Sequence, residues 1–226
     1  LAAKEADETP RGVMVQDTAW DGYEEIPSWI MQGYGTMAME AGEQLKEYGC
    51  ERPTHIFVQA GVGSLAGAVV GYYSNLYADN PPTFVVVEAE AAACLYKGAA
   101  AGDGDIRIVD GDMETIMAGL ACGEPNTISW DILKNHVKVF IAAPDWVAAN
   151  GMRMLGAPIK GDAPVTSGES GAAPFGALAA VMTMDEYKDL RNDIGLDASS
   201  KVLLFSTEGD TDPDRYKNIV WKGLDK

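Results

Sequence analysis

The stretch that decides the fold is HIFVQAGVGSLAGAVVGYY, residues 55–73. Residues 55–59 are mostly apolar and predict a strand. Gly61 and Gly63 then predict a tight turn, and residues 64–77 predict a helix. A strand, a glycine turn and a helix in this order are typical of an anion-binding loop, because the N–H groups at a helix N-terminus face the anion.

The rest of the chain continues this alternation of strands and helices. TFVVVE (83–88) and VKVFIA (137–142) are apolar runs, which is typical of strands buried on both faces of a parallel sheet. Further predicted strands are residues 106–109 and 201–207, and further predicted helices are residues 26–48, 89–100, 113–122, 130–135, 144–155, 172–182, 185–194 and 213–221. The pattern predicts an α/β fold, a parallel sheet with helices on both faces. We expect one such unit over residues 1–226, with an irregular leading segment over residues 1–25.

The composition of the chain argues against several classes of binding partner. The formal net charge is −17 and there is no block of basic residues, which argues against nucleic-acid binding. No apolar run approaches the about 18 residues that span a membrane, and no secretory signal is visible. Cys50, Cys94 and Cys122 are too few for a disulfide scaffold or a zinc cluster, and free thiols are favoured over a Cys94–Cys122 pair. We expect a cytoplasmic protein with no metal site and no membrane contact.

The glycine turn has three interpretations. GVGSLA (61–66) matches the dinucleotide fingerprint G-x-G-x-x-[GA], and Glu88 ends the next predicted strand. A nucleoside triphosphate is excluded, because no Gly-Lys-Ser/Thr follows. A single phosphate held by backbone N–H groups also fits. Because Gly67 and Gly71 would also allow close helix packing without a ligand, this stretch alone leaves the dinucleotide, monophosphate and packing interpretations open.

Two later loops favour the monophosphate. SGESG (167–171) and STEGDTD (206–212) both fall where a predicted strand and helix meet, and ligands of open parallel sheets gather at the carboxyl edge of the strands. Both loops are rich in hydroxyl groups, which suit a cofactor whose ring nitrogen stays neutral. A simple nicotinamide enzyme needs no such additional loops.

Four stretches carry a family resemblance. QDTAWDGYEEIPSWIMQGY (16–34), QAGVGSLAG (59–67), GDMETIMAGLACGEPN (111–126) and the pair of hydroxyl-rich loops together resemble diaminopropionate ammonia-lyase. That family belongs to the tryptophan synthase β-like enzymes, which are pyridoxal 5'-phosphate proteins of fold type II. The resemblance implies conversion of either enantiomer of 2,3-diaminopropionate to pyruvate and ammonia by α,β-elimination, in a homodimer.

The resemblance also implies a missing part. Chains of the family are much longer than this one, and their Schiff-base lysine lies in the N-terminal half. No lysine of this sequence stands in that motif. The chain therefore resembles the C-terminal half, with the phosphate loop and the ring-nitrogen contact but without the covalent anchor, and is expected to be inactive alone. The alternative function is a non-catalytic nucleotide- or NAD-binding module that uses the GVGSLA loop.

The resemblance assigns the cofactor phosphate to the glycine loop. Gly61, Val62, Gly63, Ser64 and Leu65 are expected to cradle it through backbone N–H groups, and the Ser64 hydroxyl is expected to add a donor.

The loop after the last predicted strand is expected to meet the cofactor ring. Ser206 stands where the family places the serine that contacts the ring nitrogen, and Thr207 is the substitute because the loop here reads S-T-E-G-D. A hydroxyl leaves that nitrogen unprotonated. Asp210 and Asp212 could bind a monovalent cation, but capping of the final helix is favoured.

Five ionisable residues have candidate roles. Asp17, in QDTAWDGY, is expected to hold the substrate's amino group or to move its protons, the alternative being a helix cap or a surface acid. Glu88 would bind ribose only in a dinucleotide site, and otherwise ends its strand. Glu169 lines the cofactor edge or orders its own loop. His55 and His136 are expected to be structural.

Overall fold

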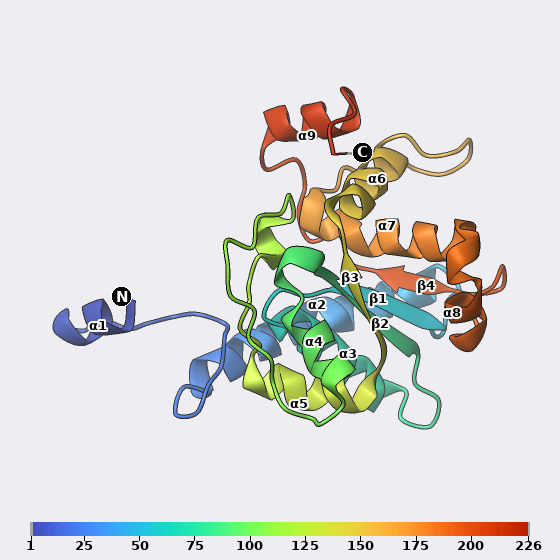
Figure 1. The fold of residues 1–226 in the computed structure, drawn as a ribbon. Coiled ribbons are helices and arrows are strands. Elements are labelled where there is room, and N and C mark those ends of the chain that lie inside the picture. The colour runs from blue at the N-terminus through green and yellow to red at the C-terminus, as the bar shows by residue number, and fades with distance from the viewer. Residues whose placement is uncertain (1, 226) are drawn as a thin grey trace.

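The computed structural model describes residues 2–225, and a four-stranded parallel sheet forms its centre (Figure 1). The strand order is β3-β2-β1-β4. The bounds are β1 His55–Gln59, β2 Thr83–Ala89, β3 Val137–Ala143 and β4 Val202–Leu204. All of β1 is buried, and so is nearly all of β2, which explains why these strands read as continuous apolar runs. The predicted α/β fold class is confirmed.

Helices cover both faces of the sheet, as Figure 1 shows. The apolar side chains on the two faces form two separate buried clusters. Helices packed on one face are α2 Glu25–Glu47, α3 Ser64–Leu76, α4 Cys94–Ala101 and α5 Thr127–His136. Helices packed on the other face are α6 Asp145–Gly156, α7 Glu169–Thr183, α8 Lys188–Asp193 and α9 Pro213–Val220. Helix α1, Ala2–Glu8, stands away from the body at the end of an extended segment (Figure 1).

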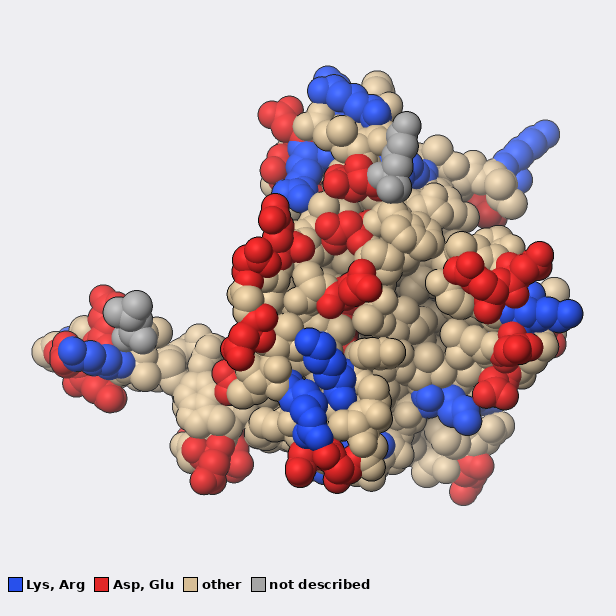
Figure 2. All heavy atoms as spheres, in the orientation of Figure 1, with Lys and Arg blue, Asp and Glu red and all other residues tan. Residues whose placement is uncertain are grey.

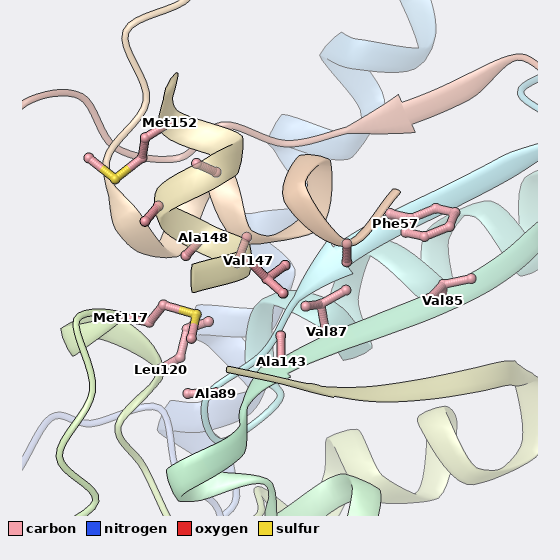
Figure 3. Close-up of a cluster of buried hydrophobic side chains, with 14 of the residues drawn as sticks. Phe57, Val85, Val87, Ala89, Met117, Leu120, Ala143, Val147, Ala148 and Met152 are labelled. Carbon is pink, nitrogen blue, oxygen red and sulfur yellow. The ribbon is translucent and has the colours of Figure 1, made fainter. Parts of the chain in front are cut away.

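Glycines allow close contacts between neighbouring helices. In the cluster of Figure 3, α6 packs on α7 so closely that a Cβ on Gly176 would lie 1.9 Å from the Val147 carbonyl oxygen. On the opposite face, a Cβ on Gly67 would lie 2.9 Å from Ser129 Cβ. Gly67 therefore supports the packing interpretation of the glycine-rich helix, whereas a Cβ on Gly71 would make an ordinary 3.7 Å contact with Ile132.

Two predicted elements between α4 and α5 are wrong. Residues 106–109 form no strand, because Ile106 and Ile108 are exposed and Val109 N–H donates to Gly123 of the same loop. Residues 113–122 are an irregular segment with one short 3₁₀ turn, Ala118–Leu120. The Asp145 carboxylate accepts hydrogen bonds from the hydroxyl of Thr115 and the backbone N–H that follows it, and so holds the segment against α6.

Three other predicted segments have different bounds in the structure. The strand predicted over 201–207 ends at Leu204, so the hydroxyl-rich loop begins earlier than expected. The leading segment, residues 1–25, was expected to be irregular, but Ala2–Glu8 is helical. The helix predicted over 89–100 is a 3₁₀ turn, Glu90–Ala92, followed by α4.

On the face in Figure 2, groups of Asp and Glu are interspersed with groups of Lys and Arg, and other residues form most of the surface. Among residues 2–225, no helix is both long and apolar enough to cross a bilayer.

Candidate functional site

A cavity of about 410 Å³ lies at the carboxyl edge of the sheet. Its wall begins with Gln59 at the end of β1 and continues through the glycine loop to Leu65 in the first turn of α3. Ser170, in the first turn of α7, lies on the wall with Thr207 and Glu208 from the loop after β4. Residues 119, 120 and 122 close another side. Segments far apart in the sequence thus meet where ligands of open parallel sheets bind.

The glycine loop leaves backbone donors at the cavity. Gly63 has φ 101°, a left-handed conformation that strains other residues. The first hydrogen bond of α3 runs from Gly67 N–H to the Gly63 carbonyl, so the N–H groups of Ser64 and Leu65 precede the ladder. A Cβ on Gly61 would lie 3.1 Å from the carbonyl oxygen of Gly119 across the cavity wall. The lining residues include no Lys or Arg, so an anion here would be held by N–H groups and the helix dipole.

The Ser64 hydroxyl was expected to donate a hydrogen bond to the cofactor phosphate, but it does not face the cavity. Ser64 Oγ is buried and donates to the Asp17 carbonyl oxygen at 2.8 Å, and it accepts from Asn126 Nδ2 at 3.1 Å. With its proton committed, the hydroxyl adds no donor to the loop, and only the backbone N–H of Ser64 remains for an anion. The Ser64 hydroxyl instead fixes the segment around Asp17 on α3.

Asn126 is a structural residue of the site that sequence reasoning missed. Its backbone N–H donates to the Val62 carbonyl at 2.8 Å, and its side chain accepts from Ser129 N–H at 2.9 Å, which caps α5. Asn126 therefore ties the glycine loop to α5 and, through its amide nitrogen, to the Asp17 carbonyl. The signal was present as an Asn before the first turn of a helix, a preferred N-cap.

Asp17 lies at the rim of the cavity with its backbone fixed by Ser64 and Asn126. Burial raises the pKa of Tyr34, and the negative charge of Asp17 adds to that increase. The pKa of the Cys122 thiol is raised by the same two causes in the same order. Because Tyr34 and Cys122 also line the cavity, the Asp17 carboxylate lies within electrostatic reach of whatever the cavity holds.

The loop after β4 brings Thr207 to the cavity and turns Ser206 elsewhere. Ser206 Oγ donates to Ser167 Oγ at 2.8 Å, and Ser206 is not among the lining residues. Thr207 lines the cavity, and its Oγ1 accepts from Gln59 Nε2 at 2.9 Å. The Glu208 carboxylate accepts from Ser170 N–H at 2.6 Å and from the next N–H along α7, which fixes the loop on that helix N-terminus. Thr207, the expected substitute, is therefore better placed than Ser206.

Glu88 is buried and takes no part in the cavity wall. Its two carboxylate oxygens accept from the N–H groups of Leu95, at 2.8 Å, and Tyr96, at 2.7 Å, at the start of α4. Burial raises the pKa of Glu88 to about 7, although these two hydrogen bonds act in the opposite direction. Since both oxygens are committed to the helix, Glu88 has no contact left for a ribose, and the dinucleotide interpretation of the loop loses its acidic residue.

The other ionisable candidates, His55, His136, Glu169 and Asp212, are not among the residues that line the cavity. His55 Nε2 lies 2.8 Å from the Ile194 carbonyl oxygen, and His136 is an exposed residue at the end of α5. Glu169, at the start of α7, pairs with Arg215 of α9 at 3.2 Å. Asp212 caps α9, with its side chain accepting from Arg215 N–H at 3.0 Å. Cys50, Cys94 and Cys122 are free thiols. Among residues 2–225, no group of three or more His, Cys, Asp or Glu could hold a metal ion.

The residues around the cavity fit a phosphate-bearing ring cofactor. The helix N-terminus supplies donors, the absence of a side chain at Gly61 leaves room beside Gly119, and Thr207 supplies a hydroxyl group in the cavity lining. The volume, about 410 Å³, lies in the range of sites for small organic ligands.

Comparison with known proteins indicates the same class of ligand, a ring cofactor that bears a phosphate. Residues 2–202 match the model of the family described as pyridoxal-phosphate dependent enzyme. The chain is 55% identical over 217 residues to a diaminopropionate ammonia-lyase of Salmonella typhimurium, covering 96% of this chain and 54% of the relative. It is 50% identical to the enzyme of that name from Escherichia coli K12, covering 93% of this chain and 52% of the relative.

Solved structures agree with this result. A crystal structure of the Escherichia coli diaminopropionate ammonia-lyase, in complex with an aminoacrylate–PLP azomethine reaction intermediate, superposes with a TM-score of 0.86 at 48% identity. That match covers 93% of this chain and 53% of the crystallised one. The chain thus spans about half the length of the curated relatives it matches. On the matched family model, the identity to its relatives and the geometry of the cavity, the chain belongs to the family of pyridoxal-phosphate-dependent enzymes.

Proposed function

We propose that this chain is the cofactor-holding part of an ammonia-lyase that converts 2,3-diaminopropionate to pyruvate and ammonia. The observation that carries the proposal is the cavity that is lined both by the glycine loop and by Thr207 of the loop after β4. The relatives that are 50–55% identical and bear the name diaminopropionate ammonia-lyase support the choice of substrate.

Pyridoxal phosphate, when bound, supplies an electron sink that stabilises negative charge on the substrate carbon. The chain's own residues hold and surround it. The N–H groups of Ser64 and Leu65, with the dipole of α3, bind the phosphate. The Thr207 hydroxyl, which lines the cavity, would be the neutral partner of the ring nitrogen. The Asp17 carboxylate binds the substrate's ammonium group or moves one of its protons at the rim.

The activity requires a part of the enzyme that these residues do not supply. The resemblance places the lysine that anchors the cofactor in the upstream half of the family's chains, and the chain covers 54% of the Salmonella relative. Loss of a covalent nucleophile and base commonly lowers turnover by several orders of magnitude. We therefore expect the 226-residue chain alone to bind pyridoxal phosphate weakly and to release no pyruvate.

The structure offers a place where the upstream half could pack. Within residues 2–225, β3 pairs only with β2 and so forms one edge of the sheet. Edge strands usually carry charged residues that prevent further pairing, but β3 has only one, Lys138. An apolar cavity of about 350 Å³ adjoins it, with Val139, Ile141, Val181 and Leu190 in its wall. An apolar edge strand invites pairing, so we assign this edge to the upstream half. A homodimer of the whole enzyme is part of the same proposal.

The test uses a joined protein, in which residues 1–226 follow the upstream half of the Salmonella typhimurium relative in one polypeptide. Leu65 lines the cavity in the first turn of α3. Leu65→Glu places a carboxylate against the phosphate, whereas Leu65→Gln is a control of equal size without the charge. Gly63 is less suited, because its φ of 101° would strain any side chain.

Cofactor retention is measured by the visible absorption band of pyridoxal phosphate after gel filtration. We expect the joined protein and Leu65→Gln to retain the cofactor and Leu65→Glu to lose it. Equal retention by both variants would show that the phosphate lies elsewhere. Retention of NAD in place of pyridoxal phosphate would support the nucleotide-binding alternative.

A further inference from the structure

Gln59 is a buried polar side chain whose amide connects the ends of two strands. It is the last residue of β1 and only 2% exposed. Its Nε2 lies 2.9 Å from the Phe205 carbonyl oxygen and 2.9 Å from Thr207 Oγ1. Its Oε1 is buried and has no hydrogen-bond partner among residues 2–225. A buried unsatisfied polar atom is rare in folded proteins and requires a reason.

The hydrogen-bond partners fix the orientation of this amide. The Phe205 carbonyl can only accept, so the amide atom beside it must be the nitrogen. An amide nitrogen has two hydrogens, and the second points to Thr207 Oγ1. Turning the amide over would place Oε1 against the Phe205 carbonyl and give two acceptors in contact. The unsatisfied Oε1 is the consequence of keeping Nε2 between these two oxygens.

This orientation decides what the Thr207 hydroxyl can do. Because Thr207 Oγ1 accepts from Gln59, its own proton is free to be donated. The structure gives this proton no acceptor among residues 2–225, and Thr207 lines the cavity. Ser206 differs, because its proton is already donated to Ser167 Oγ at 2.8 Å. The loop thus presents one hydroxyl proton to the cavity.

A second contact keeps Thr207 in reach of Gln59. Glu208, the next residue, is held on the N-terminus of α7 by the N–H groups of Ser170 and Gly171. Its carbonyl also accepts from Gly168 N–H at 3.1 Å. The position of Thr207 is therefore set by α7, and the direction of its proton by β1.

We propose that Gln59 is a positioning residue that directs the Thr207 hydroxyl proton into the cavity, where it is donated to the ring nitrogen of pyridoxal phosphate. The inference rests on the proposed function, because it needs the cofactor in this cavity. Its consequence is a ring nitrogen that accepts a hydrogen bond and stays unprotonated, with Gln59 acting through the Thr207 hydroxyl.

Gln59→Glu tests the polarity of the contact at almost constant shape. An ionised carboxylate at this position has no N–H or O–H to donate to Thr207 Oγ1. The Thr207 hydroxyl then donates to the carboxylate, and its lone pairs face the cavity. Thr207→Val removes the hydroxyl altogether. Gln44→Glu makes the same chemical change at an exposed position of α2 and is the matched control.

The readout is the NMR resonance of pyridoxal phosphate isotopically labelled at the ring nitrogen, bound to the joined protein, followed with pH. We expect the unchanged protein and Gln44→Glu to show an unprotonated, hydrogen-bonded nitrogen. Gln59→Glu and Thr207→Val should both move the resonance, and Gln59→Glu should move it toward the protonated value. The visible absorption band, measured on the same samples, reports whether the cofactor is retained.

Three results would overturn the inference. If Gln59→Glu retains the cofactor with an unchanged resonance while Thr207→Val shifts it, Gln59 does not direct the proton. If Ser206→Ala alone shifts the resonance, the ring contact is Ser206. If the unchanged joined protein retains no pyridoxal phosphate, the proposed function fails and the inference with it. Should Gln59→Glu not fold, Gln59→Met removes the donor without adding a charge, and an unchanged resonance there is equally contradictory.

Discussion

Substitution of Glu88 by Gln should change how the stability of the chain depends on pH. Glu88 is buried and accepts two backbone hydrogen bonds at the start of α4. Burial raises its pKa from 4.5 to about 7. Between these values the folded chain binds more protons at this site than the unfolded chain, so the free energy of unfolding falls as pH rises.

The size of the effect follows from the two pKa values. The interval from 4.5 to about 7 corresponds to about 3 kcal/mol, at about 1.4 kcal/mol per pH unit. Most of this loss, about 2.5 kcal/mol, falls between pH 5 and 8. The amide introduced by Glu88→Gln would not titrate, so the variant lacks this part of the slope. It also leaves one of the two N–H groups without an acceptor, which costs about 1–3 kcal/mol at every pH.

Urea denaturation of the chain at several pH values between 5 and 8 measures both effects. We expect Glu88→Gln to be less stable than the unchanged chain at pH 5 and to lose less stability as pH rises. Glu90→Gln, an exposed neighbour, is the control for the general effect of removing one negative charge. Parallel stability profiles for the unchanged chain and Glu88→Gln would refute the argument that burial controls this carboxyl group.

Three further predictions concern packing, capping and the site. Gly176→Ala should destabilise the chain by about 1–3 kcal/mol in urea denaturation, because its Cβ would lie 1.9 Å from the Val147 carbonyl oxygen; unchanged stability would mean that α6 and α7 can separate freely. Asp212→Ala should cost about 0.5–2 kcal/mol, since Asp212 caps α9 by accepting from Arg215 N–H; equal stability in urea would contradict the cap. Asp17→Asn in the joined protein should keep the cofactor's absorption band and lower pyruvate release, and unchanged release would remove Asp17 from the reaction.

Local patterns made much of the fold predictable. The strands over 55–59 and 83–88 were readable because each is buried on both faces, so its sequence is apolar without alternation. The same rule misled at residues 106–109, where IRIV has strand composition but no neighbouring strand to pair with among the described residues. At residues 113–122 the apolar spacing suggested a helix, but Asp145 of a distant helix binds the segment in an irregular conformation.

The site was predictable where its chemistry is local. The glycine loop lies within one strand–turn–helix unit, so its donors could be placed from sequence alone. The choice between Ser206 and Thr207 could not, because it depends on Gln59, which lies 148 residues from Thr207 in sequence. The Ser64 hydroxyl was misassigned for the same reason, since its acceptor is the carbonyl of Asp17, 47 residues away.

The central claim is that this chain holds the cofactor for a lyase whose covalent anchor lies outside these residues. Pyruvate release from 2,3-diaminopropionate, measured side by side for the 226-residue chain and the joined protein with added pyridoxal phosphate, tests it most directly. We expect pyruvate from the joined protein and none above background from the chain alone. Release by the chain alone at a rate near that of the joined protein would contradict it.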